Sequence, residues 1–307
     1  MLQKDRYRKR MTLGQNGNFL VLLLAILTIV FCIFKFIYIA YYLSGWAESA
    51  FYKNIFDWFR LPAEVDKLST RPWTIISYMF MHDRVFHLLG NLLWLWAFGF
   101  ILQDLAGNNK IIPLFLYGGV AGAFIFILVN NLFPVLAAQI EGKTLEGASA
   151  GVMAIAIAAT TLAPDFRILP MLNGGIPLWV LTVIFVIIDF ASITGQNGGG
   201  HLAHLGGAAM GFIFVRQLRK GRDWSLWMNR FFDWWADLFN PDKKEWKKTA
   251  RKELHYDSKG SHPYKKTANV TQKRIDEILD KINQQGYRFL SDEEKEILKR
   301  ASEEEHL

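Results

Sequence analysis

Apolar residues are gathered along this chain into six runs, which shorter polar segments separate. The first run, residues 19–43, is long enough for a helix to cross the roughly 30 Å hydrocarbon core of a bilayer at about 1.5 Å per residue. Five more runs follow, at 86–102, 111–133, 147–163, 176–191 and 201–215. The pattern therefore predicts an all-α polytopic membrane protein whose residues 19–216 form a bundle of six transmembrane helices.

Two of the later runs are short for a full crossing. Run 147–163 would make about 25 Å of helix and run 201–215 about 22 Å, against roughly 30 Å of hydrocarbon. We expect their outer ends to begin below the membrane surface, where irregular backbone is tolerated only beside protein or a water-filled cavity. Polar residues at these ends therefore indicate a wet site within the membrane layer.

Composition and charge agree with this interpretation and add an orientation. The 307 residues are 51% hydrophobic, and the net charge of +7 is concentrated in segment 1–18 and after the sixth run. Basic flanks of this kind are typical of the cytoplasmic ends of membrane spans, and they do not form the single basic face of a nucleic-acid-binding protein. We therefore expect both termini in the cytoplasm. Without a transit peptide, the basic amino terminus favours a bacterial cytoplasmic membrane.

Three parts follow the membrane bundle. Residues 217–240 place aromatic residues at helical spacing and predict an amphipathic helix at the cytoplasmic interface. Residues 241–270 are rich in lysine and predict a basic linker near anionic lipid. Residues 271–307 predict a cytoplasmic hairpin of two helices, the first ended by Gly286 and the second opened by the capping box SDEE at 291–294.

Unusual polar residues stand at the amino-terminal ends of the second, fourth and sixth predicted spans. If the first helix runs outward, these three spans all run inward, so their first residues share the external side. Polar groups at membrane depth are costly, and their concentration at one depth indicates a function. They are His82, His87 and Asn91 for the second span, Ser149 for the fourth, and His201 and His204 for the sixth.

The chemistry of a serine hydrolase fits these residues. A serine nucleophile needs a base for its proton and small neighbours that let backbone and substrate approach, and Ser149 lies in the stretch GASAG. His201 and His204 are three residues apart on one helix face, so either could be the base. Gly207 and Gly211, one turn below His204 and four residues apart, favour close packing against the helix that carries the serine.

Three ordered motifs across residues 73–211 resemble those of the rhomboid family of intramembrane serine proteases. They are HDRVFHLLGNLLWLW from His82, GASAG with Gly147 and Gly151 around Ser149, and AHLGGAAMG from Ala203. Three features depart from the family pattern. Ala150 follows the serine where glycine is common, and Met153 stands where an aromatic residue often packs against the catalytic imidazole. Residues Pro72 to Thr74 read PWT where many members have Trp-Arg.

The resemblance implies a function and assigns roles. Ser149 would be the nucleophile and His204 the general base, forming a dyad, while His87 and Asn91 would help to bind the oxyanion. His82 and His201 would support them. The implied activity is hydrolysis of peptide bonds in or near transmembrane segments, without metal or cofactor. The implied partners are transmembrane protein substrates and membrane lipids, and the active site would open to the external side.

Other interpretations are compatible with parts of the pattern. A catalytically inactive rhomboid-like protein that binds membrane clients would keep the fold. A metal or haem protein could use the four histidines, but we expect no carboxylate or cysteine to join them as a ligand, and the serine would have no role. Asp189, at the outer end of the fifth span, could be a third member of a catalytic triad. It is interpreted instead as an ordinary acid near a helix end, because the family resembled works without a third member. The glycine-rich stretch 194–200 is either a mobile lid or a plain connector.

Overall fold

The computed structural model describes residues 18–168, 175–195, 197–238 and 272–304. The chain divides into two compact units, residues 1–238 and 239–307. The predicted segment 1–18 lies outside the described residues except for Asn18, and the predicted linker 241–270 lies outside them entirely.

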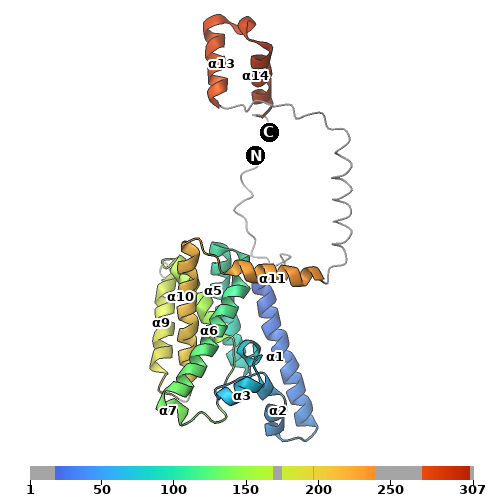
Figure 1. The fold of residues 1–307 in the computed structure, drawn as a ribbon, viewed down its shortest axis with the longest axis vertical. Helices are drawn as coiled ribbons and strands as arrows, with labels where there is room; N and C mark the ends of the chain where they lie inside the picture. Colours follow the sequence, from blue (N-terminus) through green and yellow to red (C-terminus); the bar gives the residue numbers. More distant parts are fainter. Residues whose placement is uncertain (1–17, 169–174, 196, 239–271, 305–307) are drawn as a thin grey trace. The chain divides into compact units, whose positions relative to one another are not determined.

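The first unit is an all-α bundle, as predicted (Figure 1). Each of the six predicted runs forms a helix within a few residues of its expected bounds. These helices are α1 (Phe19–Leu43), α5 (Val85–Ala106), α6 (Ile111–Leu132), α8 (Ser149–Leu162), α9 (Leu178–Ala191) and α10 (Gly198–Arg219).

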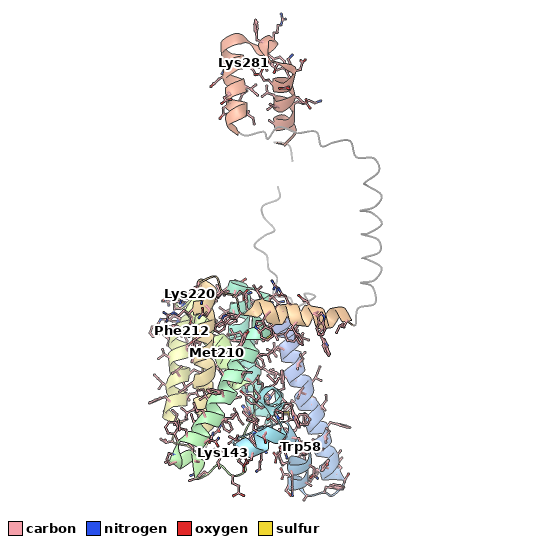
Figure 2. The ribbon with its side chains drawn as sticks, in the orientation of Figure 1. Trp58, Lys143, Met210, Phe212, Lys220 and Lys281 are labelled. Carbon is pink, nitrogen blue, oxygen red and sulfur yellow. The ribbon has the colours of Figure 1, made fainter. Side chains whose placement is uncertain are left out.

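By length and composition, three stretches of the described residues are able to cross a membrane: Phe19–Leu43, Val85–Ala106 and Asn108–Leu132. Helices α8 and α9 are apolar but have only 14 residues each. Helix α10 has 22 residues but includes several glycines and two histidines. The outer faces of the bundle carry exposed apolar side chains such as Phe212 of α10 (Figure 2), as expected of a multi-pass membrane protein in contact with lipid.

Helices α6, α8 and α10 pack with their backbones in close approach. A Cβ atom added at Gly207 would lie 2.1 Å from the carbonyl oxygen of Ala150, and one at Gly211 would lie 2.2 Å from that of Ala154. On α6, a Cβ at Gly118 would lie 2.3 Å from the Cβ of Ala154. These distances leave no room for a side chain, so the small residues on all three helices determine how closely α8 is held.

The segment between α1 and α5 folds into short elements, which the hydrophobic pattern did not predict. They are α2 (Glu48–Asn54), η1 (Phe56–Trp58), β1 (Leu61–Pro62), α3 (Val65–Thr70), α4 (Thr74–Ser77) and η2 (Tyr78–Phe80). Strand β1 pairs antiparallel with β2 (Thr144–Leu145), with Leu61 opposite Leu145. This pairing fixes the segment beside the residues that lead into α8. A second short pair joins β3 (Arg167–Ile168) to β4 (Ile176–Pro177).

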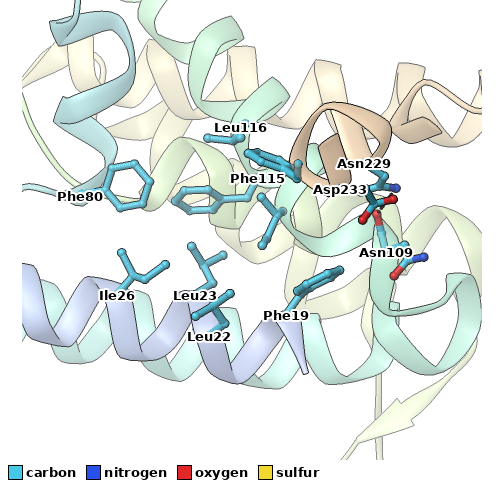
Figure 3. Close-up of a pocket in the computed structure, with 12 residues that line it drawn as sticks. Phe19, Leu22, Leu23, Ile26, Phe80, Asn109, Phe115, Leu116, Asn229 and Asp233 are labelled. Carbon is cyan, nitrogen blue, oxygen red and sulfur yellow. Dashed lines mark hydrogen bonds between the residues drawn. The ribbon is translucent and has the colours of Figure 1, made fainter. Parts of the chain in front are cut away.

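Helix α11 (Ser225–Leu238) lies within the predicted amphipathic segment and contacts the start of α6. The side chain of Asn229 donates to the carbonyl of Asn109 at 3.1 Å, and Lys110 forms an ion pair with Asp223. Together with α1 and α6, α11 encloses a mainly apolar cavity of about 450 Å³ (Figure 3). None of the predicted site residues lines this cavity, so it is distinct from the candidate site.

The second unit contains the predicted helical hairpin, α13 (Gln272–Gln285) and α14 (Asp292–Glu304), joined through η5 (Tyr287–Phe289). Gly286, with φ of 92°, ends the first helix. The capping box is confirmed: Ser291 N–H donates to Glu294 Oε2 at 2.8 Å, and Glu294 N–H donates to Ser291 Oγ at 3.2 Å. Lys281 ties α13 to the same Glu294 at 2.9 Å.

Candidate active site

Ser149 and His204 are in direct contact. Ser149 is the first residue of α8 and His204 lies near the start of α10, and Ser149 Oγ is 2.6 Å from His204 Nε2. The close packing of α8 on α10 through Gly207 brings the two side chains together. Of the two histidines that the sequence left open as the base, only His204 contacts the serine within the described part of the chain.

Gly147 shapes the approach to Ser149. Its φ of 110° lies in the region that favours glycine, and its N–H donates to the carbonyl of Tyr78 at 2.9 Å. A Cβ atom at this position would lie 2.6 Å from Cε1 and 2.9 Å from Nε2 of His87. Glycine is therefore required both for the turn before α8 and for the room that the His87 ring occupies.

Ala150, where the family pattern often has glycine, is accommodated by glycines on the neighbouring helices. A Cβ at Gly122 of α6 would lie 2.6 Å from the Cβ of Ala150, and Gly207 of α10 leaves room for its carbonyl. Met153 is fully buried one turn further along α8. Gly151 faces α6, where a Cβ would lie 2.5 Å from the ring of Phe115. The departures from the family pattern thus fit within the packed core.

Next to Ser149 lies a second group of polar side chains: His82, His87 and Asn91. His82 Nε2 is 3.2 Å from Asn91 Nδ2 and 3.3 Å from the backbone nitrogen of Ala148. Since both neighbours are donors, Nε2 of His82 must be an acceptor. Asn91 Nδ2 also donates to the carbonyl of His87 at 3.0 Å. The His82 and His87 rings lie edge to face at 5.1 Å.

Asn91 and His87 differ in whether their side chains have a hydrogen-bond donor that is not already used. Both N–H groups of the Asn91 amide are directed to partners, His82 and the His87 carbonyl. Within the described residues, the ring nitrogens of His87 have no hydrogen-bond partner. The sequence resemblance gave these two residues the same role, but the geometry leaves only the His87 ring ready to donate to a bound group.

Burial, and secondarily the nearby His87, lower the pKa of His82 to about 3 from an ordinary value of about 6.5. An unfolded histidine takes up a proton below about pH 6.5, while folded His82 stays neutral until about pH 3. The stability that His82 contributes is thus fully present above pH 6.5 and is lost as the pH falls through this window.

Replacing His82 with glutamine is therefore expected to reduce the sensitivity of the fold to acid. The glutamine oxygen can accept hydrogen bonds near the position of Nε2 but does not titrate. Between pH 7 and pH 5, wild type should lose about 2 kcal/mol more stability than His82→Gln. Melting temperatures of both proteins in detergent at the two pH values measure the difference, and equal losses would contradict this account.

Asp189 is not the ordinary helix-end acid that the sequence suggested. Its side chain is buried, and its Oδ1 lies 2.8 Å from Nδ1 of His201 and 2.8 Å from Nδ1 of His204. The interpretation was wrong because the short connection between α9 and α10 turns the end of one helix onto the start of the next. A carboxylate at membrane depth needs a partner, and that signal was available in the sequence.

The same three residues bear on the alternative of a metal protein. A carboxylate does join two of the histidines, contrary to the sequence argument, because ligand atoms of Asp189, His201 and His204 lie within 4.8 Å of one another. However, separations of 2.8 Å between nitrogen and oxygen are those of hydrogen bonds to a carboxylate. Hydrogen bonding accounts for the group, and a metal site would still leave the contact of Ser149 with His204 unexplained.

The glycine-rich stretch 194–200 is only partly a connector: residues 194, 195 and 197 lie between α9 and α10, whereas the last three glycines belong to α10. Gly198, Gly199 and Gly200 form the first turn of α10 and are buried. A Cβ at Gly199 would lie 2.5 Å from the side-chain nitrogen of Asn130 on α6. The glycines are explained by close helix contact, and residue 196 lies outside the described part.

A partly buried ionic network, which sequence reasoning missed, supports the entrance to α8. Glu146 Oε1 accepts from the backbone N–H of Asp83 at 3.3 Å, and Oε2 lies 3.5 Å from Arg60 Nη1. Burial raises the pKa of Glu146, and Arg60 opposes that shift. Asp83 also accepts from Lys35 at 3.3 Å and Tyr52 at 2.9 Å. The network ties α1 and the segment before α5 to the residues just before Ser149.

Comparisons with known families place this site within a named domain. A family model described as Rhomboid domain matches residues 69–220, which include all the predicted site residues and Asp189. A model described as a family of unknown function, DUF6576, matches residues 262–304, the helical hairpin.

Several curated proteins are similar over the same part of the chain. RHOMBOID-like protein 12, mitochondrial, of Arabidopsis thaliana is 26% identical over 50% of this chain and 48% of its own length. Rhomboid protein 1, mitochondrial, of Saccharomyces cerevisiae is 31% identical over 48% and 42%. Rhomboid protease GlpG of Pectobacterium atrosepticum is 27% identical over 37% and 36%.

The match thus spans less than half the length of each of these relatives. Two of the three are mitochondrial, so the comparisons do not support the expectation of a bacterial cytoplasmic membrane.

Proposed function

Because this chain belongs to the rhomboid family, we propose that it is an intramembrane serine endopeptidase that hydrolyses peptide bonds in or near transmembrane segments of other membrane proteins. One observation carries the proposal: the 2.6 Å contact between Ser149 Oγ and His204 Nε2 at a polar site between buried helix ends. This is the distance at which a base can take the proton of a nucleophile.

The proposed reaction proceeds in two halves. Ser149 Oγ attacks the carbonyl carbon of the scissile bond while His204 Nε2 takes the hydroxyl proton. His204 then returns that proton to the leaving amine, and the C–N bond breaks to leave an acyl-enzyme on Ser149. Water, deprotonated by the same imidazole, hydrolyses the acyl-enzyme and restores the serine. The chain's own side chains supply each proton transfer.

The negative charge on the attacked oxygen needs donors that are already in place. The N–H of Ser149 is one, because it belongs to the first turn of α8 and has no acceptor within the described residues. The His87 ring, held over Gly147, is the side-chain donor that we assign. We assign Asn91 and His82 to holding this group in position, since their hydrogen bonds are made to each other and to the backbone.

Replacing His87 with alanine is therefore expected to lower kcat by about 10²-fold to 10³-fold with KM nearly unchanged, as for the loss of one oxyanion donor. Asn91→Ala should lower kcat less and reduce the melting temperature more, because it removes a buried hydrogen-bonding side chain. Kinetics of transmembrane substrate cleavage in liposomes give both constants. A larger kcat loss for Asn91→Ala would reverse the assignment.

The proposed substrates are transmembrane proteins, and membrane lipids are the proposed surroundings of the bundle. An α-helix encloses its carbonyl groups in hydrogen bonds, so the segment to be cut must first unwind. We expect cleavage near small or helix-breaking residues for this reason. The site lies at the starts of α5, α8 and α10, and we propose that it opens to the membrane side opposite both termini.

The test of the proposed function uses the full chain in liposomes with a panel of transmembrane substrates. Cleavage that persists in chelator, together with covalent labelling of Ser149 by a fluorophosphonate located by mass spectrometry, would support the proposal. Binding of transmembrane clients without cleavage or labelling would instead indicate an inactive rhomboid-like protein.

A further inference from the structure

We propose that Asp189 is a positioning residue for the catalytic imidazole, so that Ser149, His204 and Asp189 act in line and His201 shares the carboxylate. The inference rests on the proposed function and adds to it. A base that stands alone in a dyad must be oriented by packing, whereas here a buried carboxylate contacts the far nitrogen of the ring.

The geometry assigns the protons on His204. Its Nδ1 is 2.8 Å from Asp189 Oδ1, while its Nε2 is 2.6 Å from Ser149 Oγ. An ionised carboxylate only accepts hydrogen bonds, so Nδ1 must carry the hydrogen of the neutral ring. Nε2 is then left as the acceptor that the serine proton requires. Asp189 thus selects the tautomer that can react and lies next to the imidazolium that forms during attack.

The burial of Asp189 excludes a role as a surface acid. The residue is 4% exposed, and its Oδ2 has no hydrogen-bond partner in the described ranges 18–168, 175–195, 197–238 and 272–304. A carboxylate buried at membrane depth is costly unless it is paired. The N–H groups of the His201 and His204 rings pair with Oδ1. The carboxylate can therefore stay buried only because these two histidines of the proposed site contact it.

His201 acts through Asp189. Its Nδ1 is 2.8 Å from the same Oδ1 that His204 contacts, and the two rings are 5.7 Å apart, nearly perpendicular. His201 makes no hydrogen bond to Ser149 among the described residues. The second hydrogen bond holds Oδ1 toward α10 and limits the rotation of the carboxylate. His201 therefore helps to hold Asp189, which in turn orients the His204 ring.

The experiment compares Asp189→Asn, Asp189→Glu and Thr182→Val in the full chain. Asp189→Asn keeps the size of the side chain but removes its charge and lets the amide donate, so both tautomers of His204 are accommodated. It is expected to lower kcat and the rate of Ser149 labelling by about 10²-fold to 10⁴-fold, with KM within about threefold of wild type.

Thr182→Val is the matched control. Thr182 lies two turns earlier on α9, is also buried, and forms a hydrogen bond of 2.6 Å with Thr160 of α8. Its replacement removes a partly buried hydrogen bond between α8 and α9 without reaching the site. The melting temperature should fall at least as much as in Asp189→Asn, while kcat and labelling stay within about threefold of wild type.

Asp189→Glu distinguishes orientation by a charge from simple packing. The longer carboxylate side chain of glutamate is expected to retain more activity than the isosteric amide of asparagine. The value of kcat should therefore decrease from wild type to Asp189→Glu to Asp189→Asn. An Asn variant that equals wild type, or exceeds Glu, overturns the inference. If wild type itself neither cleaves substrate nor becomes labelled, the proposed function is refuted. If wild type is active and the Asn variant equals it, only the role of Asp189 is refuted.

Discussion

Replacing Ser149 or His204 with alanine is expected to lower the rate of substrate cleavage by about 10⁴-fold or more, the largest effect of any substitution in this chain. Without Oγ no acyl-enzyme can form, and without the imidazole the serine loses the base that lies 2.6 Å from its Oγ. Because the two residues act as one unit, the double variant should be no slower than the slower single variant.

Initial rates of cleavage in liposomes, with melting temperatures in detergent, measure this effect. Ser149→Ala exchanges one small residue for another at a helix end, so its melting temperature should change little. Thr161→Ala, which removes a hydroxyl from the opposite end of α8, is the matched control and should retain wild-type rates. Either site variant retaining more than about a tenth of the wild-type rate would refute the assignment.

A second large effect, on both stability and rate, is expected from one methyl group at Gly207. A Cβ there would lie 2.1 Å from the Ala150 carbonyl oxygen, a backbone atom that cannot move by a change of rotamer. Gly207→Ala must therefore push α10 away from α8 and separate His204 from Ser149. We expect a loss of about 1–3 kcal/mol in stability and about 10²-fold or more in kcat, the cost of roughly 1 Å of misplacement.

Gly90→Ala is the control for this substitution because it adds the same methyl group to a helix where nothing lies within 4 Å. Alanine is the better helix former by about 1 kcal/mol, so Gly90→Ala should leave the melting temperature unchanged or raise it. A lower melting temperature for Gly207→Ala, with an unchanged or higher one for Gly90→Ala, would establish that close helix packing causes the loss at Gly207. If Gly207→Ala is as well tolerated as Gly90→Ala, the packing account of the site is wrong.

The hydrophobic pattern predicted the helices because burial in lipid requires long apolar runs, and such runs are a local property of the chain. Run 201–215 lies inside α10, and run 147–163 contains α8. Gly207 and Gly211 also indicated which helix face would approach the serine, since spacing by four residues defines one face of a helix. The motifs were sufficient to place Ser149 near a histidine.

Other features came from contacts between segments that no local pattern connects. Glu146, Arg60 and Asp83 meet only because β1 pairs with β2 and brings two distant loops together. The glycines at 198–200 were expected in a loop or lid, but they pack in the first turn of α10, where Gly199 faces Asn130. In both cases the residue types were visible in the sequence, but their partners were not.

By itself, the sequence determined an all-α membrane bundle, the helix on or just before which each motif residue lies, and the helix faces of small residues through which α8 and α10 meet. Only the tertiary structure decided that His204 and not His201 contacts Ser149, and that Asp189 contacts both imidazoles. The physical reason is that periodicity fixes which residues share a face of one helix. The rotation and register of α9 against α10 depend on all the neighbours that pack around them.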